Sequence, residues 1–145
     1  KKFNTYDSAG VLFCKLLNIP VGIITGENAA SVKRRAEKLH VDYLFLGAKD
    51  KMSIICDLAK EMNINLSDIA YVGDDINDYI LLRNVGLSAA PSSAPDYMKE
   101  IVTWKLEKKG GEGVFREFVE KILTENDIDI IDLLKRKSLI PYYKQ

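Results

Sequence analysis

A short apolar run that ends in a glycine and two adjacent acids, at residues 69–75, constrains this chain more than any other segment. Its first four residues suit a buried strand, and the glycine marks a tight turn into a helix. A third acid, Asp78, follows Asp75 by three residues. The segment therefore gathers carboxylates at the carboxyl end of a strand, where open α/β sheets bind their ligands.

Two interpretations of these acids stay open. Adjacent carboxylates repel each other, and burial disfavours their charged forms. A divalent cation such as Mg²⁺, which prefers oxygen ligands, would relieve both effects. The plainer alternative is an aspartate that caps the helix, with its neighbours in solvent. Residues 69–78 alone favour neither interpretation.

Helical and strand patterns alternate along the chain. We expect helices over residues 7–17, 28–39, 51–62, 77–84, 94–102 and 114–123, and strands over residues 21–24, 43–46, 69–72, 86–89 and 103–106. Asp7 and Asn28 are the candidate caps of the first two helices. This order predicts an α/β fold in which a mainly parallel sheet has helices on both faces. Residues 1–5 look like the end of a strand that has no partner, and the tail from residue 126 is helical around residues 130–134.

Composition excludes several classes of function. Lys plus Arg and Asp plus Glu number 21 each, so no basic excess points to nucleic acid. No apolar run approaches the ~20 residues that span a membrane. Cys14 and Cys56 lie in apolar helical patterns and indicate buried free thiols of a reducing compartment, the cytoplasm. His40 is the only histidine, which argues against zinc sites and Ser-His-Asp triads and favours a capping or surface role for this residue.

Two further strand ends carry groups suited to an anion. Thr25 and Gly26 follow the strand at residues 21–24, and a hydroxyl and an amide there can donate to phosphate oxygens. The alternative is an ordinary turn. Lys51 begins a helix, where the macrodipole disfavours a cation unless that cation has a target. The alternative for Lys51 is a surface lysine, and neither feature decides the matter by itself.

The order of these groups is more informative than each group alone. Thr25, then Lys51, then the pair Asp74 and Asp75 resembles motifs two, three and four of the haloacid dehalogenase superfamily of phosphohydrolases. A receiver domain of the flavodoxin-like type would show its acidic pair first. Segments 3–10, 26–27, 34–39 and 109–117 are similar to the small capless phosphatases of this superfamily that act on keto-sugar-acid phosphates. These are the 3-deoxy-manno-octulosonate (KDO) 8-phosphate phosphatases and the nonulosonate (KDN or sialic acid) 9-phosphate phosphatases.

The resemblance covers residues 1–123 as one phosphatase core, and residues 124–145 form a tail outside it. It implies a three-layer, Rossmann-like fold without a cap domain, and Mg²⁺ as the cofactor. Asp74 would bind the metal with Asp75 nearby, and Thr25 and the amide of Gly26 would hold phosphate oxygens. Lys51 would counter the charge of the transition state. Asp78 would orient Lys51 or cap its own helix.

One departure from the family is serious. The first motif of the family, Asp-x-Asp after the first strand, supplies the nucleophile that forms an aspartyl-phosphate and the general acid/base. No such motif stands at the start of this chain. The resemblance places it in a segment that would precede Lys1. We therefore expect that the chain lacks an N-terminal piece and that, as given, it does not hydrolyse phosphate esters by the family mechanism.

The resemblance also suggests a substrate and an assembly. Glu27 replaces an arginine usual in the octulosonate group, and Glu27, Arg35 and Lys38 form the set expected of the nonulosonate group. The alternative is a solvated helix face. Residues 110–116 resemble a loop that enters the site of an adjacent subunit, where Arg116 would supply a cation in a homotetramer. The alternative is a helix-entry loop with a surface arginine.

A second class of function stays open at this stage. By resemblance, the chain could be a non-catalytic oligomerisation module of the same fold, associated with sugar-nucleotide synthesis. The missing nucleophile favours that alternative. Retention of Thr25, Lys51 and Asp74 favours the enzyme, because a scaffold has no need of these groups.

Overall fold

The computed structural model describes residues 7–136, so the strand end expected at residues 1–5 lies outside the described residues. The helices are α1 (Asp7–Leu16), α2 (Ala30–Leu39), α3 (Lys51–Met62), α4 (Tyr79–Asn84), α5 (Asp96–Lys99), α6 (Val114–Glu125) and α7 (Ile130–Arg136). The strands are β1 (Gly22–Ile24), β2 (Tyr43–Phe45), β3 (Ala70–Val72), β4 (Leu87–Ala90) and β5 (Trp104–Lys105). Two 3-10 turns, η1 (Leu66–Asp68) and η2 (Ile76–Asp78), flank β3.

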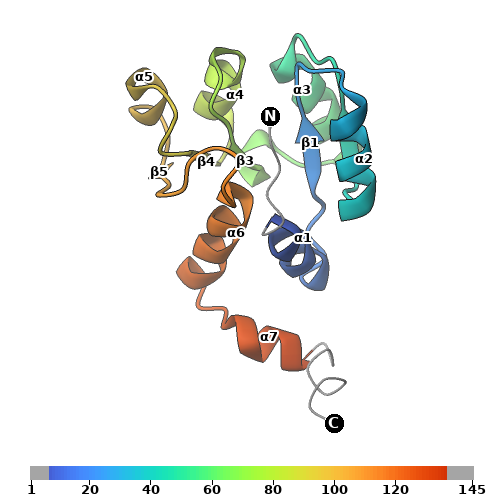
Figure 1. The fold of residues 1–145 in the computed structure, drawn as a ribbon, viewed down its shortest axis with the longest axis vertical. Coiled ribbons are helices and arrows are strands. Elements are labelled where there is room, and N and C mark those ends of the chain that lie inside the picture. Colours follow the sequence, from blue (N-terminus) through green and yellow to red (C-terminus); the bar gives the residue numbers. More distant parts are fainter. Residues whose placement is uncertain (1–6, 137–145) are drawn as a thin grey trace.

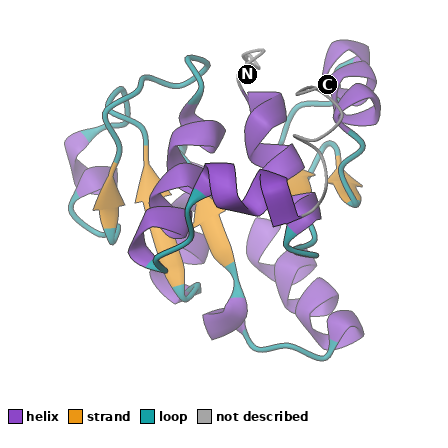
Figure 2. Ribbon diagram, turned by 90° about the horizontal axis from the view of Figure 1, so that it is seen from below, coloured by secondary structure: helices purple, strands orange, loops and turns teal. Residues whose placement is uncertain are grey.

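The prediction of a parallel sheet with helices on both faces is confirmed, with one difference (Figures 1 and 2). The strands form two sheets instead of one. β1 pairs with β2, and β3, β4 and β5 form the second sheet in that order. Every pair is parallel, with Ile23 opposite Leu44 in the first sheet and Tyr71 opposite Ser88 in the second. Residues of β1 and of β3 line the same pocket, so these two strands lie at the inner edges of the sheets.

Apolar residues of α1 and α6 pack together on one side of the sheets. Val11 and Phe13 of α1 share a buried cluster with Val119 and Leu123 of α6. Gly10 permits the close approach of the two helices, because a Cβ at this position would lie 2.9 Å from the ring of Phe115. Burial of apolar side chains is the main force that joins these two helices, which come from opposite ends of the chain.

The core on the α3 and α4 side is a separate cluster. It contains Ile24 of β1, Ile55 of α3 and Leu81 of α4, which are all buried. α3 has the bounds that its amphipathic pattern predicted. Its start is fixed by Asp50, whose carboxylate accepts a hydrogen bond from the Ser53 amide.

Of the two predicted caps, Asp7 has a further role outside its own helix, and Asn28 is not the cap of α2. The carboxylate of Asp7 accepts hydrogen bonds from the amides of Phe115 and Arg116, at 3.1 and 3.4 Å, and so caps the first turn of α6. The N-cap of α2 is Ala29, not Asn28, and it makes no side-chain cap bond. A cap between distant helices depends on tertiary packing, which local sequence patterns do not contain.

The tail is only partly separate from the rest of the fold. α6 runs to Glu125, and Ile128 and Ile130 then pack against the cluster between α1 and α6. Leu133 of α7 is 1% exposed. Within residues 7–136, the helices are too short or too polar to cross a membrane. Both cysteines are free thiols; Cys14 is buried, as expected, and Cys56 is half-buried.

Candidate active site

The carboxyl ends of β1 and β3 and the first turn of α3 meet at one polar pocket. The residues that line this polar pocket are Thr25, Gly26, Glu27, Lys51, Asp74, Asp75, Asn77 and Asp78. The three strand-end groups singled out in the sequence therefore come together in space. Parallel strands place their carboxyl ends at a common edge, which explains why groups so far apart in sequence converge.

A buried ion pair lies at the base of the polar pocket. Lys51 Nζ donates to Asp78 Oδ1 at 2.7 Å, and the two side chains are 4% and 0% exposed. Lys51 is the first residue of α3, so its ammonium sits where the helix dipole is unfavourable. The negative charge of the Asp78 carboxylate offsets this unfavourable interaction with the helix dipole. The hydrogen bond also fixes the direction of the Lys51 ammonium.

Tyr71 is a site residue that the sequence analysis missed. Its hydroxyl donates to Asp78 Oδ1 at 2.5 Å, while Asp78 Oδ2 accepts from the amides of Asp74 and Asp75 at 3.2 and 3.1 Å. An aromatic hydroxyl inside a strand that is predicted to be buried needs a hydrogen-bond partner, and that requirement was the available signal. Asp78 thereby holds Lys51 and also closes the turn after β3.

These contacts shift the pKa values of the buried groups. Burial raises the pKa of Tyr71 far above its ordinary value, and the nearby charge of Asp78 adds to this effect. Burial by itself would also raise the pKa of Asp78. The hydrogen bonds from Lys51 and Tyr71, together with the charge of Lys51, outweigh burial and lower that pKa. Asp78 is therefore a carboxylate, and Tyr71 is a neutral donor to it.

Gly73 is required by the position of Asp78. A Cβ at this residue would lie 2.7 Å from Asp78 Cγ and 2.8 Å from its Oδ2. The Asp78 side chain cannot move aside without losing its contacts to Lys51 and Tyr71. The glycine before the acidic pair thus makes room for the carboxylate that follows it.

Thr25 forms a turn and also lines the polar pocket. Its side chain is buried, and Oγ1 accepts a hydrogen bond from the Glu27 amide at 3.1 Å. A hydroxyl oxygen that accepts this bond keeps its hydrogen for donation. The turn that the plainer interpretation predicted is therefore present, and it orients the Thr25 hydroxyl at the edge of the polar pocket. Gly26 is exposed beside it.

The two acids after β3 have different surroundings. Asp74 is half-buried and lines the polar pocket with Thr25 and Lys51. Asp75 is exposed and caps η2 through the Ile76 amide, at 2.8 Å, so the capping interpretation holds for this residue. No group of three or more metal-binding side chains occurs within residues 7–136. Mg²⁺ commonly binds one or two carboxylates and completes its shell with water and phosphate, and Asp74 with Asp75 fits that pattern.

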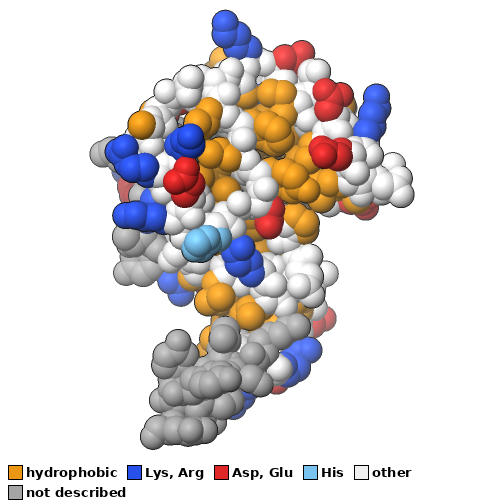
Figure 3. Space-filling view, turned by 90° about the vertical axis from the view of Figure 1, so that its right-hand side faces the viewer, with side chains coloured by type: hydrophobic (Ala, Val, Ile, Leu, Met, Phe, Trp, Pro, Cys, Tyr) orange, Lys and Arg blue, Asp and Glu red, His pale blue; other side chains and the backbone are white. Residues whose placement is uncertain are grey.

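The remaining predicted site residues differ in whether they line the polar pocket. Glu27 lines the polar pocket, whereas Arg35 and Lys38 lie on α2 and are not among its lining residues. α2 carries four basic side chains, and Lys and Arg gather on the face of the molecule that includes α2 (Figure 3). Within the described part of the chain, the buried Nε of Arg35 has no hydrogen-bond partner.

Arg116 is not among the residues that line the polar pocket, whereas the loop before it comes close to Asp74. Arg116 lies in the first turn of α6, and its Nε donates to Glu120 at 2.5 Å. The Gly110 amide donates to the hydroxyl of Ser93 of the same chain at 2.9 Å. A Cβ at Gly110 would lie 3.3 Å from Asp74 Oδ2, so this loop passes close to the acidic pair.

Comparison with known proteins agrees with this arrangement. The family model for haloacid dehalogenase-like hydrolases matches residues 36–118. The chain belongs to the haloacid dehalogenase-like hydrolases. Its curated relatives within this family include the 3-deoxy-D-manno-octulosonate 8-phosphate phosphatases of Haemophilus influenzae, 32% identical, and Salmonella typhi, 33% identical, each over 85% of this chain. The chain spans 68% and 65% of the lengths of these two relatives.

Solved structures of this hydrolase family share the fold. A probable phosphatase from Pseudomonas syringae has a TM-score of 0.82 at 36% identity, over 86% of this chain and 70% of that chain. An octulosonate 8-phosphate phosphatase from Moraxella catarrhalis, solved with magnesium, phosphate and KDO, has a TM-score of 0.81 at 33% identity, over 86% and 71% of the two chains. The predicted family and its α/β fold are confirmed.

Proposed function

We propose that the polar pocket binds Mg²⁺ and the phosphate group of a 3-deoxy-keto-sugar-acid phosphate, and that the chain takes part in hydrolysis of this phosphoric monoester. The observation that carries the proposal is the convergence of Thr25, Lys51 and Asp74 at one edge of the sheets. This convergence supports the enzyme over the alternative of an oligomerisation module, because a scaffold needs neither a buried cation nor a hydroxyl directed at an anion.

Each group has a role that its surroundings support. The hydroxyl of Thr25 and the amide of Gly26 donate to phosphate oxygens. Lys51, held by Asp78, opposes the negative charge that develops on the transferred group. Asp74 and Asp75 would hold Mg²⁺, which, when bound, neutralises phosphate charge and polarises the phosphorus–oxygen bond.

We further propose that the nucleophile lies outside the described residues. Of the acids that line the polar pocket, Asp78 is fully buried and accepts four hydrogen bonds, from Lys51, Tyr71 and two amides. A carboxylate with this many partners is a poor nucleophile. Asp74 and Asp75 are the acids proposed to hold the metal, and Asp75 also caps a turn.

The substrate class follows from the relatives, which are named for KDO 8-phosphate. A narrower proposal is a nonulosonate 9-phosphate, of KDN or sialic acid, which rests on Glu27, Arg35 and Lys38. Glu27 supports this narrower proposal because it lines the polar pocket. Arg35 and Lys38 would act through a substrate that extends from the pocket toward α2.

Assays of three proteins test the proposal. The 145-residue chain, assayed with Mg²⁺ on KDO 8-phosphate and on a nonulosonate 9-phosphate, should show no turnover. A version extended at its N-terminus by an apolar strand that ends in Asp-x-Asp should hydrolyse both, and the nonulosonate ester faster. The Lys51→Met variant of the extended chain should lose activity on both substrates.

Two outcomes would contradict parts of the proposal. A folded extended chain that binds neither Mg²⁺ nor phosphate would favour the oligomerisation module. Robust turnover by the short chain would contradict the assignment of the nucleophile.

Assembly forms a separate part of the proposal. We propose a homotetramer in which Arg116 contributes to the site of a neighbouring subunit. In the extended protein, subunits that carry Arg116→Ala are to be mixed with subunits that carry Lys51→Ala. If Arg116 acts across an interface, some sites in the hybrids carry neither defect, and activity returns. Subunit exchange that native mass spectrometry demonstrates, without recovered activity, would show that Arg116 does not act across the interface.

A further inference from the structure

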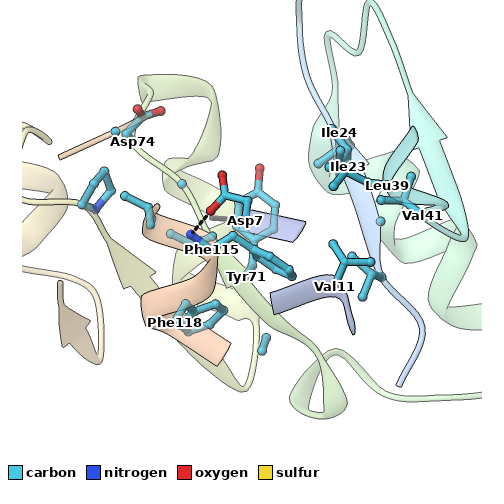
Figure 4. A pocket seen from close by; sticks show the side chains of 18 of the residues that line it. Asp7, Val11, Ile23, Ile24, Leu39, Val41, Tyr71, Asp74, Phe115 and Phe118 are labelled. Atoms are coloured by element: carbon cyan, nitrogen blue, oxygen red, sulfur yellow. Dashed lines mark hydrogen bonds between the residues drawn. The ribbon is translucent and has the colours of Figure 1, made fainter. Parts of the chain in front are cut away.

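The loop before α6, residues 107–113, passes beside a proposed metal ligand, and we call it the glycine loop. A Cβ at Gly110 would lie 3.3 Å from Asp74 Oδ2 and 3.4 Å from Ser93 Oγ. Gly110, Gly111 and Asp74 also line one pocket between the two sheets. Figure 4 shows Asp74 on the same side of this pocket as Phe115 of α6. The glycine loop and the acidic turn after β3 are therefore neighbours, although they are far apart in the sequence.

Glu117 holds the first part of the glycine loop with both of its carboxylate oxygens. Oε2 accepts a hydrogen bond from the Glu107 amide at 2.8 Å, and Oε1 accepts one from the Lys108 amide at 2.9 Å. Two bonds to adjacent amides fix the orientation of the loop as well as its position, and the charge of the acceptor strengthens both bonds. Glu117 suits this role because it lies in the first turn of α6, where the helix dipole favours a negative charge.

Two serines after β4 hold the middle of the glycine loop. The Ser92 amide donates to the Lys108 carbonyl at 2.9 Å, and the Ser93 hydroxyl accepts from the Gly110 amide at 2.9 Å. Residues 107–110 are exposed, so they bury little surface of their own. The hydrogen bonds from α6 and from the segment after β4, rather than apolar packing, therefore determine where Gly110 lies.

The path of the loop after Gly110 also depends on glycine. Gly111 and Gly113 have φ of 83° and 88°, in the left-handed region that side chains disfavour. These two residues turn the chain into the first turn of α6, which begins at Val114. A short path of defined conformation thus joins Gly110, beside Asp74, to the helix that carries Glu117.

The Asp74 carboxylate depends on its neighbours for its direction. The Asp74 amide donates to Asp78 Oδ2, but no donor within residues 7–136 forms a hydrogen bond with the Asp74 carboxylate. A carboxylate that is free to rotate loses this freedom when it binds a metal ion, and the loss lowers its affinity. Gly110 limits the rotation from one side, because even a single methyl group there would be in tight contact with Oδ2.

We propose that Glu117 is a positioning residue for the metal site: it holds the glycine loop against Asp74, and the loop keeps the Asp74 carboxylate directed at Mg²⁺ in the polar pocket. The inference rests on the proposed function, because it requires Asp74 to bind the metal. Glu117 does not line the polar pocket, so it acts through the loop and not by contact with the metal or the substrate. Residues that orient metal ligands in this indirect way commonly contribute about 10–100-fold to metal affinity.

The competing explanation is that Glu117 only joins the loop to α6 and stabilises the fold. The two explanations differ in the quantity that Glu117 changes. A structural role affects the free energy of unfolding alone, whereas a positioning role also affects the affinity of the folded chain for Mg²⁺. Both quantities must therefore be measured for each variant, the first by urea denaturation and the second on folded protein.

Titration of Mg²⁺ into the ¹⁵N-labelled 145-residue chain, followed by the amide signals of Asp74 and Asp75, measures the affinity. Glu117→Ala removes both acceptors of the loop amides and should weaken Mg²⁺ binding about tenfold. Glu117→Gln keeps one acceptor oxygen and should weaken binding less, by about threefold. Ser93→Ala loosens the other attachment of the loop without a change of charge, and it should also weaken binding by about threefold.

Glu112→Gln is the matched control. Glu112 is an exposed residue of the same loop, and the substitution removes the same charge as Glu117→Gln does. Its side chain accepts none of the hydrogen bonds that hold the loop. The Mg²⁺ affinity of this control should therefore stay within about twofold of the parent value.

The outcomes separate the inference from its alternatives. Weaker binding in Glu117→Ala and Ser93→Ala, but not in Glu112→Gln, supports it. If folded Glu117→Ala binds Mg²⁺ as tightly as the parent chain, the role of Glu117 is structural and the inference is overturned. Equal weakening by Glu117→Gln and Glu112→Gln would assign the effect to net charge and would also overturn it. A parent chain whose Asp74 and Asp75 signals do not respond to Mg²⁺ would contradict the proposed metal site itself, and this inference with it.

Discussion

Lys51 and Asp78 form an ion pair at 2.7 Å between two side chains that are almost completely buried. The pair links the start of α3 to the turn after β3, so one carboxylate positions the cation of the polar pocket and also closes the acidic turn. A pair of this kind is costly to break from one side, because the remaining charge is left buried without a partner.

Asp78→Asn should lower the free energy of unfolding by about 3–5 kcal/mol, because the ammonium of Lys51 loses its only ionised partner among the described residues. Urea denaturation followed by circular dichroism measures the change. Asp57→Asn, at an exposed position of α3, is the matched control and should change stability by less than about 0.5 kcal/mol. A similar small change for Asp78→Asn would show that the pair contributes little.

The lowered pKa of Asp78 makes stability depend on pH in acid. A carboxylate whose pKa lies below the ordinary value of 3.8 stabilises the folded state fully above that value, and the contribution disappears as the pH falls through the folded pKa. The parent chain should therefore lose stability more steeply below about pH 4 than Asp78→Asn does.

Tyr71→Phe tests the cause of that lowered pKa. It removes one hydrogen bond to Asp78 Oδ1, so the pKa of Asp78 should rise toward its ordinary value. The acid unfolding transition should then move to higher pH than in the parent chain. Identical acid midpoints for the two proteins would show that the tyrosine hydroxyl does not stabilise the carboxylate.

Gly73→Ala should destabilise the chain by about 1–3 kcal/mol or more, because the new methyl group would lie 2.7 Å from Asp78 Cγ. Gly26→Ala is the matched control in the same pocket. Its Cβ would lie 3.5 Å from the nearest atom, which is an ordinary contact, so its thermal midpoint should stay close to that of the parent. Equal midpoints for both variants would mean that the Asp78 side chain can move aside at little cost.

The cap that Asp7 provides to α6 has a measurable contribution. Asp7→Ala should lower the free energy of unfolding by about 1–2 kcal/mol, since the amides of Phe115 and Arg116 lose their acceptor. Asp7→Asn keeps an oxygen at the same place and should recover most of that loss. If the asparagine variant is as unstable as the alanine variant, the negative charge matters more than the hydrogen bonds.

Substrate specificity can be tested on the extended chain. Arg35→Ala and Lys38→Ala should raise KM for a sugar-acid phosphate far more than for p-nitrophenyl phosphate, because only the first substrate carries a carboxylate. Each lost contact should cost about 1.5–3 kcal/mol. Lys33→Ala, an exposed change on the same helix α2, is the control and should affect neither substrate. Equal effects on both substrates would show that α2 does not contact the sugar acid.

Local patterns predicted the elements whose formation depends on local interactions. The amphipathic spacing of residues 51–62 predicted α3 to the residue, and the apolar run before Gly73 predicted β3. Thr25, Lys51 and Asp74 were placed correctly at one edge, because parallel strands fix where their carboxyl ends meet. The order of motifs was therefore sufficient to predict the position of the polar pocket.

The features that the sequence analysis missed all depend on contacts between distant or buried groups. Asp7 and Phe115 are 108 residues apart, so no window of sequence contains both. Tyr71 was counted as an apolar strand residue, and its hydroxyl acquires a role only when Asp78 folds back beneath it. The separation into two sheets is a property of the whole arrangement, since strand propensity does not specify which edges pair.

The hydrogen bonds between Asp7 and the first turn of α6 also imply that α1 cannot complete its packing until α6 has been synthesised. A ribosome releases Asp7 and α1 long before residues 114–125 emerge, and until then the apolar face of α1 that carries Val11 and Phe13 lacks its partner. Closure of a loop this long adds an entropic barrier to folding. Nascent chains that end before residue 114 should therefore expose α1 to proteases and chaperones, and protection of the N-terminal helix should appear only once α6 has left the exit tunnel.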